Sequence, residues 1–115
     1  MRALVANDPR VYRELISDAF RRMRPLIEVS AALPEQLEQA VQRVRPHLIV
    51  CSSHLSAARW EGCLAWVVLY PDGEDVAQIG GVGVRAALVR GVGLDDLLLV
   101  VDRTALLLCG SGGDR

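Results

Sequence analysis

Two serines, Ser52 and Ser53, directly follow a run of four apolar residues, Leu48 to Cys51, near the middle of the chain. A short, unbroken apolar run is typical of a strand that is buried on both faces of a parallel sheet. Pro46 prevents a helix from running into this segment. In an open α/β sheet, ligands bind at the carboxyl ends of the strands, so the chemistry at this edge depends on the two hydroxyl groups.

Three interpretations of the serine pair stay open. The simplest is a polar strand end that closes a loop. The second is a pocket for an anion or small ligand, in which Asn7 supplies an amide and Arg90 a bidentate guanidinium. The third is a covalent phosphoserine at Ser52. Because none of these includes an assembled nucleophile, base and orienting group, we expect no enzyme activity.

The composition excludes several classes of function. The chain has 115 residues, which fits a single domain, and a formal net charge of -1. This charge balance provides no field that would recruit nucleic acid or an anionic membrane. All 13 Lys+Arg residues are arginines, so no lysine is available to form a Schiff base. Since the apolar runs are too short to cross a bilayer and no signal peptide is recognisable, we expect a cytoplasmic protein without membrane contact.

The cysteines and histidines form no recognisable metal site. Cys51, Cys63 and Cys109 are scattered through apolar runs without paired spacing. On an extended strand, Cys51 and His54 would point to opposite faces, so they do not form a catalytic pair. We therefore predict buried, reduced thiols and no bound metal or cofactor.

Short apolar runs alternate along the chain with amphipathic segments of helical length. We predict strands at residues 3–6, 26–31, 48–51, 64–70 and 84–90, and helices at 11–23, 33–44 and 97–109. The first helix has apolar residues at helical spacing, namely Tyr12, Leu15, Ile16, Ala19, Phe20 and Met23. Residues 54–62 have room for two helical turns, and residues 74–79 for one short helix. This order predicts an α/β fold with a five-stranded parallel sheet.

Four segments, in the right order, resemble the receiver domain of two-component response regulators. They are Asp8 to Leu15, Arg45 to Ser52, Gly83 to Arg90, and Leu94 to Leu98. The second segment resembles the receiver run that ends at the phosphorylated aspartate. The resemblance implies a flavodoxin-like, three-layer sandwich with strand order 2-1-3-4-5. This chain departs from the family in its third and fourth helices, which we expect to be shortened. We expect a single receiver-like domain at residues 1–109 and, because of the glycines that follow, a flexible tail at residues 110–115.

The chain lacks most of the carboxylates that receiver chemistry requires. Receivers hold Mg²⁺ on two acidic residues after the first strand and phosphorylate an aspartate after the third. The acidic pair falls here on Asn7 and Asp8, or on Ala6 and Asn7, and the acceptor falls on Ser52. The resemblance therefore implies a degenerate receiver that takes no phosphate. Its remnant site consists of Asn7, Asp8, Ser52 and Ser53, with Tyr70 and Arg90 at the family's Thr/Ser and Lys positions.

The last predicted helix is apolar on nearly all sides. A helix that covers one face of a sheet needs only one apolar stripe, so the surplus leucines indicate a second contact. Receivers commonly pair through this end of the domain. We predict a homodimer or partner-protein interface at Leu98, Leu99, Val100, Leu106 and Leu107. The function that follows is a non-catalytic interaction module in signal transduction or regulation; the alternative is a small-anion sensor or residual phosphoryl acceptor.

Overall fold

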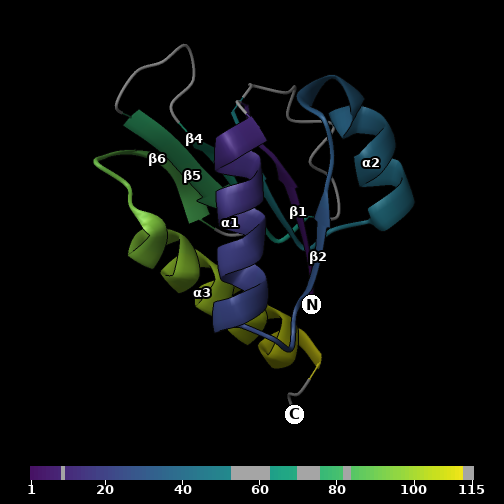
Figure 1. The fold of residues 1–115 in the computed structure, drawn as a ribbon. Helices are drawn as coiled ribbons and strands as arrows, with labels where there is room; N and C mark the ends of the chain where they lie inside the picture. Colours follow the sequence, from purple (N-terminus) through teal and green to yellow (C-terminus); the bar gives the residue numbers. More distant parts are fainter. Residues whose placement is uncertain (9, 53–62, 70–75, 82–83, 113–115) are drawn as a thin grey trace.

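The computed structural model describes residues 1–8, 10–52, 63–69, 76–81 and 84–112. In this part of the chain, six strands form one mixed sheet and three α-helices lie against it (Figure 1). The strands are β1 (Arg2–Ala6), β2 (Glu28–Ala31), β3 (Leu48–Cys51), β4 (Ala65–Leu69), β5 (Val76–Gly81) and β6 (Val84–Arg90). The helices are α1 (Arg10–Met23), α2 (Leu37–Val44) and α3 (Leu94–Gly112), with a short 3-10 turn, η1 (Pro34–Gln36), before α2. The strand order in the sheet is β2-β1-β3-β4-β5-β6.

The first four strands are parallel, as predicted. Helices α1 and α2 provide the long crossovers that parallel neighbours require. The register pairs Ala6 with Cys51, and Cys51 with Val68, so the carboxyl ends of β1, β3 and β4 lie at the same edge. Every residue of β3 is buried, which confirms the prediction of a central strand enclosed on both faces.

The prediction of five strands, all parallel, is wrong beyond β4. Residues 76–79, which were expected to end a short helix, belong instead to β5, which pairs antiparallel with both β4 and β6. Because β5 is antiparallel to both of its neighbours, β6 runs in the same direction as β4. The prediction placed these two strands side by side, whereas β5 lies between them. The glycines that suggested a helix end, Gly80 and Gly81, instead allow β5 to approach β4 closely: a Cβ at Gly81 would lie 2.6 Å from the carbonyl oxygen of Leu64.

At Gly80, the neighbouring position in β5, a side chain would meet another side chain rather than backbone. A Cβ there would lie 2.5 Å from Cζ2 of Trp66, the residue directly opposite on β4. We expect Gly80→Ala to lower the free energy of unfolding by about 1–3 kcal/mol, measured by urea denaturation, because the indole ring must move. In a Trp66→Leu background, the same substitution should cost less, since the clashing ring is gone. An equal cost in both backgrounds would show that the contact is not the cause.

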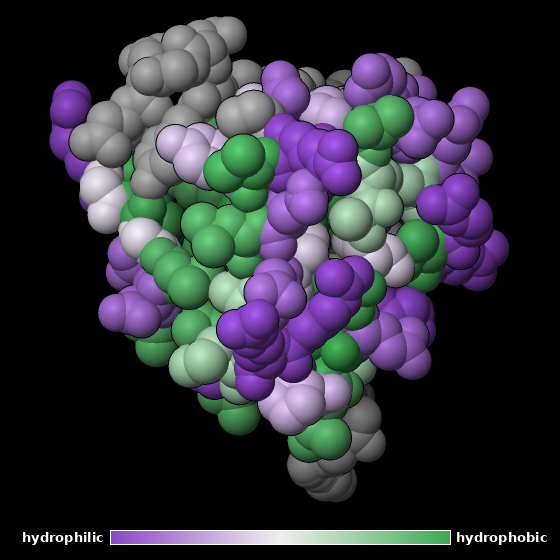
Figure 2. Space-filling model, in the orientation of Figure 1, coloured by the Kyte–Doolittle hydropathy of each residue, from purple (hydrophilic) through white to green (hydrophobic). Residues whose placement is uncertain are grey.

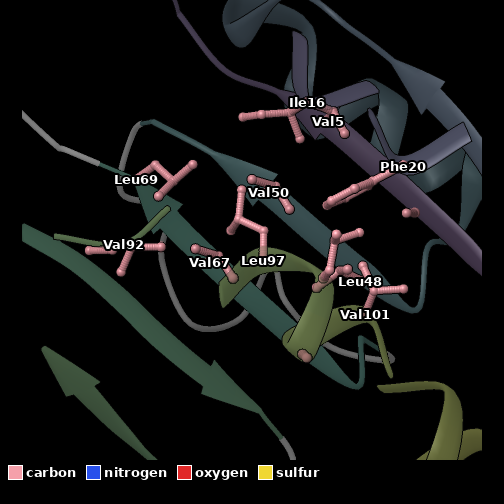
Figure 3. Close-up of a cluster of buried hydrophobic side chains, with 14 residues drawn as sticks. Val5, Ile16, Phe20, Leu48, Val50, Val67, Leu69, Val92, Leu97 and Val101 are labelled. Atoms are coloured by element: carbon pink, nitrogen blue, oxygen red, sulfur yellow. The ribbon is translucent and has the colours of Figure 1, made fainter. Parts of the chain in front are cut away.

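The helices enclose the sheet from both faces. In Figure 1, α1 and α3 lie on the near face of the sheet, and α2 lies on the other. Figure 3 shows the larger core, in which Phe20 of α1 and Leu97 and Val101 of α3 meet the side chains of Leu48 and Val50. A second cluster on the opposite face joins α2 to the alternate residues of β1, β3 and β4. These two clusters are the two interfaces of a three-layer arrangement.

An ion pair connects α3 to the segment that follows α1. The guanidinium of Arg24 donates to both carboxylate oxygens of Asp102, at 2.7 and 2.9 Å. The Arg24 hydrogen bond lowers the pKa of the Asp102 carboxyl below its usual value. Helix α3 extends through residues 110–112, which were predicted to belong to a flexible tail. No helix in the described ranges is both long enough and apolar enough to cross a membrane.

Candidate functional site

Two strand ends bring part of the predicted remnant site together. Asn7 and Asp8 follow β1, and Ser52 follows β3, the neighbouring parallel strand. The backbone N–H of Asp8 donates a hydrogen bond to Oγ of Ser52 at 2.7 Å. The structure therefore places Asn7, Asp8 and Ser52 side by side at the carboxyl edge of the sheet.

Asn7 is the most enclosed polar residue of this edge, with 1% of its surface exposed. Its backbone oxygen accepts a hydrogen bond from the guanidinium of Arg13 at 3.1 Å. Its side-chain Oδ1 is buried and has no hydrogen-bond partner among the described residues. An unpaired buried acceptor carries a desolvation cost that a bound donor would remove.

The chemistry at this edge is that of one carboxylate, one amide and one hydroxyl group. Mg²⁺ is normally held by several oxygen ligands that include carboxylates, and Asp8 supplies the only carboxylate of the three residues. The Oγ of Ser52 accepts a hydrogen bond from a backbone amide, and this contact provides no base to take the hydroxyl proton, so it does not activate the oxygen as a nucleophile. In the described ranges, no group of three or more His, Cys, Asp or Glu residues could hold a metal ion.

Arg90 lies too far from Ser52 to complete the predicted anion pocket. It ends β6, and the order β3-β4-β5-β6 puts three inter-strand steps, roughly 14 Å, between their backbones. The cause is β5, the strand that sequence reasoning missed, because it inserts between β4 and β6 and moves Arg90 outward. Arg13 is instead the guanidinium that contacts this edge. The two remaining predicted positions, Ser53 and Tyr70, lie outside the described residues.

The outer side of α3 carries most of the predicted interface residues. Leu99 and Leu106 are 57% and 71% exposed, and Leu107 is also exposed. Val100 is only partly buried, but Leu98 is buried in the core and does not belong to the exposed surface. Figure 2 shows hydrophobic residues gathered along the lower left of the molecule, where α3 lies in Figure 1.

No family model, curated protein or solved structure matches the chain.

The thiols described by the structure are buried, and Cys63 has the properties of a structural residue. Its Sγ donates a hydrogen bond to the carbonyl oxygen of Ala65 at 2.8 Å. Burial raises the pKa of the Cys63 thiol to about 11, so the reactive thiolate is scarce at neutral pH. Cys51 is completely buried in the core beneath α2. For Cys109 and His54, the structure describes no side-chain environment.

A histidine joins β1 to β3 at the amino ends of the strands, opposite the candidate site. Nδ1 of His47 accepts a hydrogen bond from the backbone N–H of Arg2 at 3.0 Å, which requires an unprotonated nitrogen. Partial burial, followed by the nearby positive charges of Arg2 and the N-terminus, lowers the pKa of His47 below 6.5.

This histidine makes stability depend on pH. In the unfolded chain His47 binds a proton near pH 6.5, whereas in the folded chain it binds the proton only at a lower pH. The free energy of unfolding should therefore fall as the pH drops below about 6.5, with no further loss below the folded pKa. Urea denaturation between pH 7.5 and about pH 5 measures this slope. His47→Asn retains an acceptor but cannot titrate, so its slope should be shallower; an unchanged slope would contradict the assignment.

Proposed function

We propose that the chain is a receiver-like, non-catalytic interaction module of signal transduction or regulation that pairs with a second copy through α3. A flavodoxin-like origin is supported by the parallel order β2-β1-β3-β4, with α1 and α3 on one face and α2 on the other. The extra strand β5 is then a departure from that pattern. The carboxyl edge supports a non-catalytic role, because Asn7 and Ser52 stand where the family has acidic residues.

The observation that carries the proposal is the second apolar face of α3. Its inner face, with Leu97 and Val101, is already packed in the core. Leu99, Leu106 and Leu107 repeat at the i, i+7, i+8 spacing of a separate outward stripe, which we call the leucine face. An exposed apolar stripe lowers the solubility of a protein, and such stripes are commonly buried in an interface with another protein.

The charges beside the leucine face favour a second copy of this chain as the partner. Asp95 and Arg103 are both exposed, and each lies four residues from Leu99 along the same side of α3. When two α3 helices pair antiparallel about Leu99, Asp95 of each copy meets Arg103 of the other. A two-fold interface needs a surface that is complementary to itself, and this arrangement provides one.

The phosphoryl-acceptor alternative predicts a covalent product. We expect incubation with acetyl phosphate and Mg²⁺, followed by intact-mass measurement, to show no added phosphoryl group. The reason is that the described contact of Ser52 is with a backbone N–H and not with a base, and that Asp8 is the one carboxylate among the described residues placed beside it. An added phosphoryl mass that disappears in Ser52→Ala would overturn the non-catalytic proposal and favour the alternative.

A further inference from the structure

A hollow of about 440 Å³ opens beside α1 and the end of β2. Arg13, Ser17 and Arg21 line it from successive turns of α1, and Ala31 lines it from β2. Ser17 is 2% exposed, and its Oγ has no hydrogen-bond partner among the described residues. Ser17, whose hydroxyl is buried and has no partner among the described residues, thus lies between the two arginines that line the hollow.

Both acidic side chains of α1 that border this hollow are already paired. Glu14 lies 2.7 Å from Arg10, and Asp18 lies 3.2 Å from Arg22. These are i, i+4 pairs along the exposed surface of the helix. The negative charge of each acid is therefore balanced by an arginine that does not line the hollow.

Arg13 and Arg21 carry the remaining positive charge of α1. Within the described part of the chain, neither forms an ion pair, and each donates only to a backbone carbonyl. Arg13 bonds to the oxygen of Asn7 at 3.1 Å, and Arg21 bonds to the oxygen of Val29 at 3.3 Å. A guanidinium held only by a neutral carbonyl makes a stronger, charge-assisted bond when a carboxylate becomes available.

The strand next to the hollow has an open edge. Among the strands that the structure describes, β2 is the outermost and pairs only with β1. The N–H groups of Glu28 and Ala32 donate to the carbonyl oxygens of Met1 and Val5. Because backbone groups alternate in direction along a strand, the N–H and C=O groups of Val29 and Ala31 point away from β1. The bond from Arg21 to the Val29 oxygen agrees with this outward direction. Unpaired edge groups of this kind are a template for another strand.

We propose that the edge of β2 binds an extended acidic peptide segment of a partner protein as an added strand. A carboxylate of the peptide lies over the hollow, where Arg21 and Arg13 pair with it and the hydroxyl of Ser17 donates to it. Arg21 protects the edge in the absence of peptide, because it occupies the Val29 oxygen. When Arg21 turns to the carboxylate, that oxygen accepts an N–H of the incoming strand, as in other strand-addition complexes.

This surface is separate from the leucine face. β2 is at one edge of the sheet and lies next to α1, whereas the leucine face is on the outer side of α3 (Figure 1). A failure of either proposal therefore leaves the other in place.

A labelled peptide tests the charge requirement. A fluorescent peptide of about eight residues, alternating valine and glutamate, is titrated with the full chain at low salt and followed by anisotropy. The same peptide with glutamine in place of glutamate is the matched control. We expect the glutamate peptide to bind at least about tenfold more tightly, and Arg21→Gln to remove most of that preference. No binding of the glutamate peptide, or equal binding of the two, would overturn the proposal.

Two further measurements test strand addition. Ala31→Pro removes an N–H that faces away from β1, so it should weaken peptide binding without breaking the ladder between β1 and β2. Methylating the backbone nitrogens of the peptide tests the same hydrogen bonds without changing the protein. We expect the methylated peptide to bind at least about tenfold more weakly. If it binds as tightly as the unmodified peptide, the segment does not add as a strand and the proposal is wrong.

Discussion

Phe20→Ala is expected to lower the free energy of unfolding by about 3–5 kcal/mol. Phe20 is completely buried and is the largest side chain in the core beneath α1 and α3. In Figure 3 its ring points from α1 toward Leu48 and Val101, so it connects the central strand with both helices of this face. Truncation leaves a cavity where three elements meet, and the remaining side chains can fill it only in part.

Met23 provides the matched control for this substitution. It lies on the same helix, was also predicted to belong to the apolar stripe, and is 54% exposed. Met23→Ala should change the free energy of unfolding by no more than about 0.5 kcal/mol in the same urea titration. Similar costs for the two substitutions would mean that α1 docks on the sheet through a different face.

Leu99→Glu is expected to weaken self-association by at least about a hundredfold. Pairing about Leu99 brings this residue of one copy against the same residue of the other, so the substitution buries two carboxylates beside each other. Because Leu99 is more than half exposed in the single chain, the substitution leaves the core intact. The dissociation constant is measured by sedimentation, and thermal unfolding of the same sample confirms that the variant is folded.

Charge reversal tests the proposed partners of that interface. Asp95→Arg and Arg103→Asp should each weaken pairing, because each places like charges together in the antiparallel arrangement. The double variant restores opposite charges at both positions and should recover most of the affinity. A double variant as weak as the single ones would show that these residues do not face each other. Leu33→Glu, an exposed leucine away from α3, should leave pairing unchanged.

The first half of the fold was predictable because its sequence signals agree with one another. The four apolar residues of β3 and the helix-length segments on either side of β2 specify parallel strands, and the structure has them. The buried face of α1 was only partly predictable. Ile16 and Phe20 are buried as expected, but Ser17 takes the place of Tyr12 and Leu15, which are exposed. The apolar spacing of α1 permits two faces, and packing against the sheet selects one.

The second half of the fold was not predictable by the same reasoning. Gly80 and Gly81 indicate a break when the chain is considered alone, and they become strand residues only because Trp66 and Leu64 of the preceding segment leave no room for a side chain. This contact is between segments, so local propensity does not contain it. Because β5 was not predicted, the prediction of the candidate site was also partly wrong. Asn7 and Ser52 meet as predicted from the adjacent ends of β1 and β3, whereas Arg90 is displaced by β5.

Sedimentation equilibrium of the unsubstituted chain, from about 1 to 100 µM, tests the central claim most directly. If the leucine face of α3 is covered by a second copy, the mass should rise with concentration from 12.5 kDa toward twice that value. A mass that stays at 12.5 kDa over the whole range would contradict self-association through α3.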